Sequence, residues 1–231
     1  MSSSKVLNSI AILLDLIDRQ DWELFQTVAL SSSSTFQAIV NSIGNCPEFN
    51  GMTLLHAVVR CNPPLDVVAK MLDICPDQLA AKDCLGRTAL HVAAGSSADP
   101  RLIKLIAHAY PSSCDVTDED GKTPLHFACD SSCELFEDDA AANKSMPKKV
   151  CHDTVRALLS ESQHAATIED LDEMNALEFA ILSDAGLETI KLLQKASSRT
   201  LESLSRSRSP SPVPEKRPRR VSDPGTLVLS H

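Results

Sequence analysis

Three histidines stand at equivalent places in the chain, which makes them the first candidates for catalytic bases. His56, His91 and His126 follow one another at intervals of 35 residues, each in the pattern Thr-x-Leu-His. A histidine base needs a nucleophile and an orienting group beside it. No ordered set of that kind accompanies these residues, and a side chain that recurs in one register is typical of a repeated structural part. The sequence therefore predicts no catalytic residue and no enzyme.

The tripeptide Gly121-Lys122-Thr123 is similar to the end of a phosphate-binding loop. The full motif also needs a glycine five residues before Gly121, where the chain has Val116. Without a glycine-rich cradle, we expect no nucleotide and no other small-molecule substrate.

A group of cysteines and one histidine raises the question of a metal. His126, Cys129, Cys133 and Cys151 are residue types that bind zinc. The pair Cys129-x3-Cys133 has no second tight pair to complete such a site. We predict buried thiols, no metal and no cofactor; a metal-dependent regulator that uses this region is the least favoured alternative.

The three histidines belong to an internal repeat. The segments GMTLLHAVVR, GRTALHVAAG and GKTPLHFACD begin at Gly51, Gly86 and Gly121, and a degenerate copy, EMNALEFAIL, begins at Glu173. After the first two copies, the segments 65–75 and 100–110 carry apolar residues at helical spacing. Each unit is thus predicted to be a helix, a turn, a second helix and an extended loop.

This unit resembles the ankyrin repeat. The resemblance rests on Thr-x-Leu-His-x-Ala in the second and third copies and on Asp-x-x-Gly at Asp83–Gly86 and Asp118–Gly121. It covers about residues 45–196, with a period slightly longer than the usual 33 or so residues. It implies an all-α solenoid of stacked helix-turn-helix repeats with hairpin loops, in which the repeated histidines hydrogen-bond within and between these loops.

The resemblance divides the chain into three parts. Residues 1–45 are expected to form a helical N-terminal cap with a polar outer face, and residues 46–196 the repeats. The spacing of 52 residues between the last two copies places an inserted loop at 131–149, after which the second helix resumes with CHDTVRALLS. Residues 197–231 are rich in Ser, Pro and Arg and are predicted to be a disordered tail.

The resemblance also implies a function: binding another protein through the hairpin tips and the concave face. It nominates seven partner-binding residues: Asp83, Leu85, Arg87, Asp118, Glu119, Asp120 and Lys122. Asp83 and Asp118 are equally explained as residues that shape the turn. Arg87, Glu119 and Lys122 are expected to be exposed. The identity of the partner is not encoded in these patterns, and the chain is expected to be monomeric.

The tail carries short motifs of its own. Its basic cluster is a candidate nuclear-import signal, formed by Lys216, Arg217, Arg219 and Arg220. Its candidate phosphorylation sites are Ser209, Ser211 and Ser222. A nuclear or RNA-linked adaptor that acts through the tail is therefore an alternative to binding through the repeats alone.

Charge and composition limit the other partners. Residues 1–195 carry a net charge of -13 and residues 196–231 a net charge of +4. An acidic body repels phosphate backbones, and the 3% aromatic content offers few platforms for base stacking. The first 20 residues predict an amphipathic helix rather than a secretion signal, and no membrane span is evident. We therefore expect a cytoplasmic or nuclear protein with reduced cysteines.

Overall fold

A computed structural model describes residues 3–29, 31–44, 46–133, 135 and 148–207. Within these ranges the chain forms eleven α-helices and no β-strand. The helices are α1 (Ser3–Asp18), α2 (Trp22–Ala29), α3 (Ser33–Gly44), α4 (Leu54–Arg60), α5 (Leu65–Ile74), α6 (Ala89–Gly95), α7 (Pro100–Ala109), α8 (Pro124–Cys129), α10 (His152–Glu161), α11 (Ala176–Leu182) and α12 (Leu187–Ser207). Short 3-10 helices precede the hairpin loops: η1 (Pro47–Phe49), η2 (Pro76–Leu79), η3 (Pro111–Asp115) and η4 (His164–Thr167).

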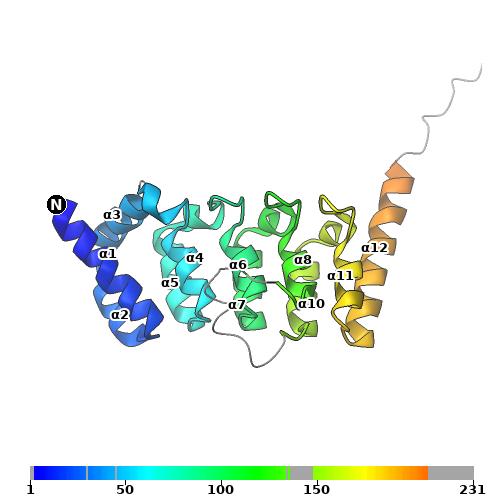
Figure 1. Cartoon of the computed structure of the whole chain (residues 1–231), viewed down its shortest axis with the longest axis horizontal. Helices are drawn as coiled ribbons and strands as arrows, with labels where there is room; N and C mark the ends of the chain where they lie inside the picture. The colour runs from blue at the N-terminus through cyan, green and yellow to red at the C-terminus, as the bar shows by residue number, and fades with distance from the viewer. Residues whose placement is uncertain (1–2, 30, 45, 134, 136–147, 208–231) are drawn as a thin grey trace, which may run out of the picture.

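The helices stack in two layers along one axis (Figure 1). The first helices of the repeats, α4, α6, α8 and α11, form the inner layer, and each contacts the next. The second helices, α5, α7, α10 and α12, form the outer layer in the same way. The predicted all-α solenoid is confirmed.

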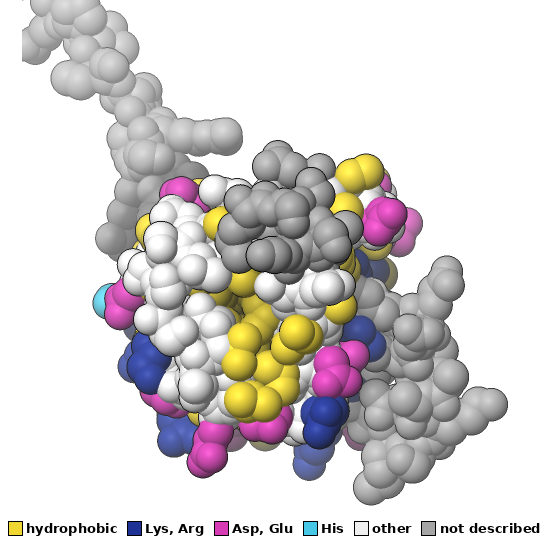
Figure 2. Space-filling view, turned by 90° about the vertical axis from the view of Figure 1, so that its left-hand side faces the viewer, with side chains coloured by type: hydrophobic (Ala, Val, Ile, Leu, Met, Phe, Trp, Pro, Cys, Tyr) yellow, Lys and Arg dark blue, Asp and Glu magenta, His cyan; other side chains and the backbone are white. Residues whose placement is uncertain are grey.

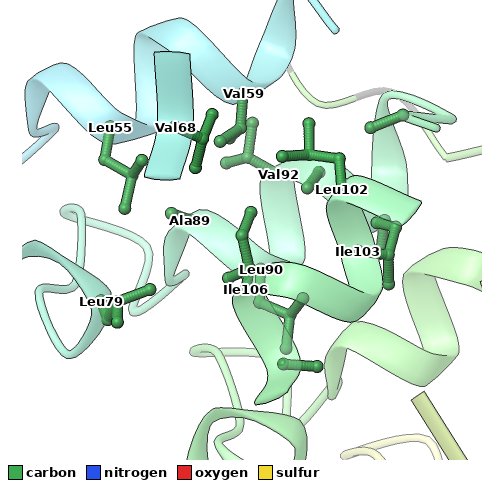
Figure 3. Packing of buried hydrophobic residues seen from close by; sticks show 14 of the residues in the cluster. Leu55, Val59, Val68, Leu79, Ala89, Leu90, Val92, Leu102, Ile103 and Ile106 are labelled. Carbon is green, nitrogen blue, oxygen red and sulfur yellow. The ribbon is translucent and has the colours of Figure 1, made fainter. Parts of the chain in front are cut away.

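Aliphatic side chains hold neighbouring repeats together. Leu90 and Val92 of α6 and Leu102, Ile103 and Ile106 of α7 are fully buried, and Figure 3 shows Val92 and Leu102 beside Val59 of the preceding repeat. Burying one such side chain contributes roughly 1.5–3 kcal/mol. Because each repeat buries its apolar face only against its neighbours, the stack is the stable unit.

The inserted segment does not break the stack. α8 ends at Cys129 and α10 begins at His152, so residues 131–149 lie between the two helices of the third repeat. α10 nevertheless packs on α7 and α8, as the second helix of a repeat should. The predicted resumption of that helix is confirmed, while residues 134 and 136–147 lie outside the described part of the chain.

The N-terminal helices continue the stack with a different surface. α1 packs on α4, and α3 packs on α5. Ile12, Leu24 and Val28 of α1 and α2 are nonetheless exposed, and Figure 2 shows hydrophobic side chains gathered on this end of the molecule. The expectation of a wholly polar outer face is wrong for these residues; the role of residues 1–45 as a cap stays a prediction.

The last helix is longer than the sequence suggested. α12 continues to Ser207, beyond the predicted start of the tail at residue 197. The Ser197 hydroxyl donates to the Ala166 carbonyl at 3.1 Å, and the Thr200 hydroxyl donates to the Gln163 carbonyl at 3.2 Å. These bonds tie the extension to η4, so a serine-rich sequence remains helical there. No helix in the described ranges is long and apolar enough to span a membrane.

Candidate protein-binding surface

The repeated histidines link one hairpin loop to the next. The His56 Nδ1 accepts a hydrogen bond from the Thr53 N–H at 3.2 Å, which closes a capping box at the start of α4. The opposite ring nitrogen, Nε2, lies 3.0 Å from the Arg87 carbonyl of the following hairpin. His91 and His126 repeat this geometry toward the carbonyls of Lys122 and Met174. The structural role predicted for these histidines is confirmed.

Burial keeps these rings neutral. It lowers the pKa of His91 to about 3, and it lowers the pKa values of His56 and His126 as well. A ring whose Nδ1 accepts from a backbone N–H and whose Nε2 donates to a carbonyl has both nitrogens engaged. Such a ring has no lone pair left to bind a metal or to accept a substrate proton.

Two of the nominated aspartates shape the hairpins. The Asp83 Oδ1 accepts from the N–H groups of Leu85 and Arg87 at 3.0 and 2.9 Å. The Asp118 Oδ1 accepts in the same way from Asp120 and Lys122. These bonds confirm the turn-forming interpretation of both residues.

Arg87 is not where it was expected. Its guanidinium is buried, forms an ion pair with the Asp83 carboxylate at 2.7 Å and donates to the Leu135 carbonyl at 2.7 Å. The expectation that Arg87 is exposed is therefore wrong. The physical reason is that one carboxylate and one carbonyl satisfy a buried guanidinium well. The Arg87 side chain thus fastens Leu135, in the inserted segment, to the second hairpin.

The concave face is closed at the second and third repeats. Every residue of α6 and α8 is buried. Leu135 lies so close to Gly95 of α6 that a Cβ there would stand 2.7 Å from its side chain. The concave surface implied by the family resemblance is therefore not open along these two helices, and the hairpin tips are left as the accessible part.

The tips combine exposed apolar and acidic side chains. Leu85 is 44% exposed, and Glu119 and Asp120 are exposed. The Glu119 N–H donates to the Leu85 carbonyl at 2.9 Å, so neighbouring tips form one continuous row. Lys122, which was expected to be exposed, is instead half-buried, because its ammonium lies 5.1 Å from the centre of the Phe179 ring.

Six of the seven nominated residues line one hollow of about 350 Å³. Its walls are Leu85, Arg87, Asp118, Glu119, Asp120, Lys122, His126, Phe127, Asp130, Ser132 and Cys133. Asp83 does not line it, since its carboxylate lies under Arg87.

Sequence reasoning missed Leu171. This residue is 75% exposed, and its N–H donates to the Asp120 carbonyl at 2.9 Å, which adds it to the same row. The signal was present, because residue 171 follows Glu119 by the 52-residue spacing of the last two repeats. We define the tip row as Leu85, Glu119, Asp120 and Leu171.

The cysteine region has the character of a protein interior. Burial raises the pKa of the Cys129 thiol to about 12 and raises that of Cys133. The half-buried Lys148 ammonium donates to the Phe127 carbonyl nearby, and desolvation lowers the pKa of this lysine. Cys151 is exposed. No group of three metal-binding side chains is present in the described ranges.

The nominated tail residues all lie outside the described part of the chain. They are Lys216, Arg217, Arg219, Arg220, Ser209, Ser211 and Ser222. Their import and phosphorylation roles stay predictions.

Comparison with known proteins agrees with the repeat geometry. The model of the family described as "Ankyrin repeats (3 copies)" matches residues 55–146. No curated protein matches the chain significantly. The family match begins in α4 and ends within the inserted segment.

Proposed function

We propose that this chain, in which residues 55–146 match the ankyrin-repeat family model, is a non-catalytic adaptor that captures a partner protein with its tip row. Ankyrin repeats are protein–protein interaction modules in general. The finer assignment rests on one contrast in this molecule. Residues of α6 and α8 are buried, whereas the tip row beside them is exposed and continuous.

The tip row has a definite chemistry. Leu85 and Leu171 flank the two carboxylates of Glu119 and Asp120, and all four lie on adjacent, hydrogen-bonded hairpins. Exposed apolar surface bordered by polar residues is typical of an interaction site. A partner with apolar residues on either side of a basic residue would complement this row.

The test compares two pairs of exposed leucines. Leu85→Lys/Leu171→Lys changes the tip row, while Ile181→Lys/Leu182→Lys changes equally exposed apolar residues at the end of α11. Each variant is compared with the wild type by affinity purification and quantitative mass spectrometry, and its unfolding is checked by circular dichroism.

We expect the tip variant to lose partners that the α11 variant keeps, with both variants as stable as the wild type. Equal partner recovery from both variants would remove the tip row as the binding surface.

A second proposed role concerns the tail. We propose that its basic cluster directs part of the protein to the nucleus and that Ser222 phosphorylation weakens this import, because added negative charge offsets the neighbouring arginines. The helix extension supplies the right truncation: removing residues 208–231 leaves α12 intact. Fluorescent fusions with and without these residues should differ in nuclear signal, and identical distributions would reject the import role.

A further inference from the structure

The outer helix layer carries two hollows that join into one groove. The first lies between α7 and α10, with a volume of about 390 Å³, and the second lies between α10 and α12, with about 210 Å³. Arg156 and Ser160 of α10 line both. We call these two hollows together the basic groove.

The charge of this groove is opposite to that of the body around it. Five basic residues line it, against one acid, Asp153. The basic residues are Arg101, Lys104, Arg156, Lys195 and Arg199. Since residues 1–195 carry a net charge of -13, this concentration of positive charge is a local exception.

Part of this positive charge is free to meet a ligand. Arg101 is paired with Asp99 at 2.7 Å, and Arg156 is paired with Asp153 at 2.8 Å. Lys104, Lys195 and Arg199 are exposed and form no ion pair with any residue in the described ranges. These three cations lie on α7 and α12, on either side of α10.

The floor of the groove is apolar. It includes Pro100 of α7, Ala157 and Leu159 of α10, and Leu192 and Ala196 of α12. A ligand that fits must therefore bring apolar groups to the floor and negative charge to the rims. A segment of protein with acidic and apolar residues has both.

We propose that the basic groove binds an acidic segment of a partner protein, on the layer opposite to the inner helices. Neighbouring packed helices lie about 8–10 Å apart, and an extended chain rises about 3.3 Å per residue. An extended segment that crosses α7, α10 and α12 would therefore place an acidic residue at about every third position. This surface is independent of the tip row, so the molecule would bridge two partners.

Other occupants fit less well. Nucleic acid would need many phosphate contacts or aromatic platforms, and no aromatic residue is among those found to line the groove. Leu135 and Lys148 of the inserted segment are bound to the second hairpin and to α8, and neither is among the residues that line the groove.

The test uses the full chain and a fluorescein-labelled peptide of repeated Glu-Glu-Leu units, about a dozen residues long, which spans roughly 40 Å when extended. Fluorescence anisotropy at low salt measures its affinity. The groove variant is Lys104→Glu/Lys195→Glu/Arg199→Glu. The charge-matched control is Lys70→Glu/Lys82→Glu/Lys149→Glu, which changes three exposed lysines outside the groove. Circular dichroism checks that both variants are folded.

We expect the wild type and the control to bind the peptide, and the groove variant to bind at least about tenfold more weakly, with an affinity that falls as salt rises. The tip variant Leu85→Lys/Leu171→Lys should bind the peptide normally. The proposal for the tip row and the proposal for the groove can therefore be rejected independently. No binding by the folded wild type, equal loss in groove and control variants, or equal binding by the groove variant would overturn the proposal.

Two further outcomes would identify a different ligand for the groove. A single-stranded oligonucleotide that binds the groove as tightly as the peptide does would identify a general anion site. Self-association in sedimentation that the groove variant abolishes would identify a second copy of this chain. Either result overturns the proposal of a partner's acidic segment.

Discussion

The internal repeats and the last repeat of this molecule cap the start of their first helix with different residues. Internal repeats close their first helix with a Thr and a His, as Thr88 and His91 do in α6. The last repeat closes α11 with Asn175 and Glu178, whose Oε2 accepts from the Asn175 N–H at 2.7 Å. Both boxes satisfy the free N–H groups of a helix start. Only the histidine also reaches forward to the next hairpin.

The turn residues of the internal repeats also differ from that of the last repeat. Gly86 and Gly121 have φ values of 76° and 79°, and Glu173 takes the equivalent place with φ of 60°. A Cβ on Gly121 would stand 3.0 Å from the Leu171 nitrogen of the following hairpin. Glu173 precedes no further hairpin within the described residues. The comparison shows that the Gly and His of the repeat are required by the following repeat, whereas the helix cap alone is satisfied by other side chains.

The largest expected loss of stability comes from placing the glutamate of the last repeat's capping box in an internal repeat. His91→Glu removes the bond to the Lys122 carbonyl and places a carboxylate in a fully buried site. We expect the free energy of unfolding to fall by about 3–5 kcal/mol, as for other unpaired buried charges. Urea unfolding followed by circular dichroism measures this loss. The reverse change, Glu178→His, should alter stability by less than about 1 kcal/mol; similar losses in both variants would break the comparison.

Exchanging the turn residues should have a somewhat smaller effect. Gly121→Glu combines a left-handed backbone with a Cβ that crowds the next hairpin, so we expect a loss of about 2–4 kcal/mol. Glu173→Gly, the matched control, should change stability by no more than about 1 kcal/mol. Thermal and urea unfolding of the two variants would show whether the following hairpin is the cause.

Acid should destabilise the protein by protonating the buried histidines that bond to the next hairpin. The pKa of His91 is about 3 in the folded protein, against 6.5 for an ordinary histidine, so the unfolded state binds more protons below pH 6.5. Stability is therefore full above pH 6.5 and is lost as the pH falls toward 3. Between pH 7 and pH 5, His91 accounts for about 2 kcal/mol of that loss, and His56 and His126 add to it in the same direction. Unfolding curves at pH 5, 6 and 7 measure the slope, which should be shallower in His91→Gln; an unchanged slope would contradict the assignment.

The smallest effect is a gain. Arg87 satisfies the Asp83 carboxylate, but Met174 occupies the equivalent place in the last hairpin, and the Asp170 Oδ2 is buried without a hydrogen-bond partner among the described residues. Met174→Arg should supply that partner and raise the free energy of unfolding by about 1 kcal/mol. A Met174→Leu control should show no gain, and a gain in both would point to packing instead.

The sequence was informative where the chain repeats. The spacing of His56, His91 and His126 predicted helix starts, hairpins and the structural role of the rings, because one residue type in a fixed register reports one recurring environment. The spacing between the last two copies also located the insertion. It did not show that Arg87 is buried, because burial of that side chain depends on the Leu135 carbonyl, 48 residues away.

Two other differences have the same origin. The sequence placed the end of the repeats at residue 196, yet α12 continues because hydroxyls of Ser197 and Thr200 bond to carbonyls near η4. Similarly, the family resemblance implied binding through the concave face, and only the packed structure shows that the residues of α6 and α8 are buried.

By itself, the sequence determined the helical repeat, its period and its acidic charge, since these follow from local spacing and composition. The tertiary structure alone decided which side chains stay accessible: it covered the inner helices, joined Leu85 to Leu171 in one row and gathered cations from α7, α10 and α12 into one groove. The physical reason is that accessibility depends on which distant segments pack together, and a local pattern does not contain that information.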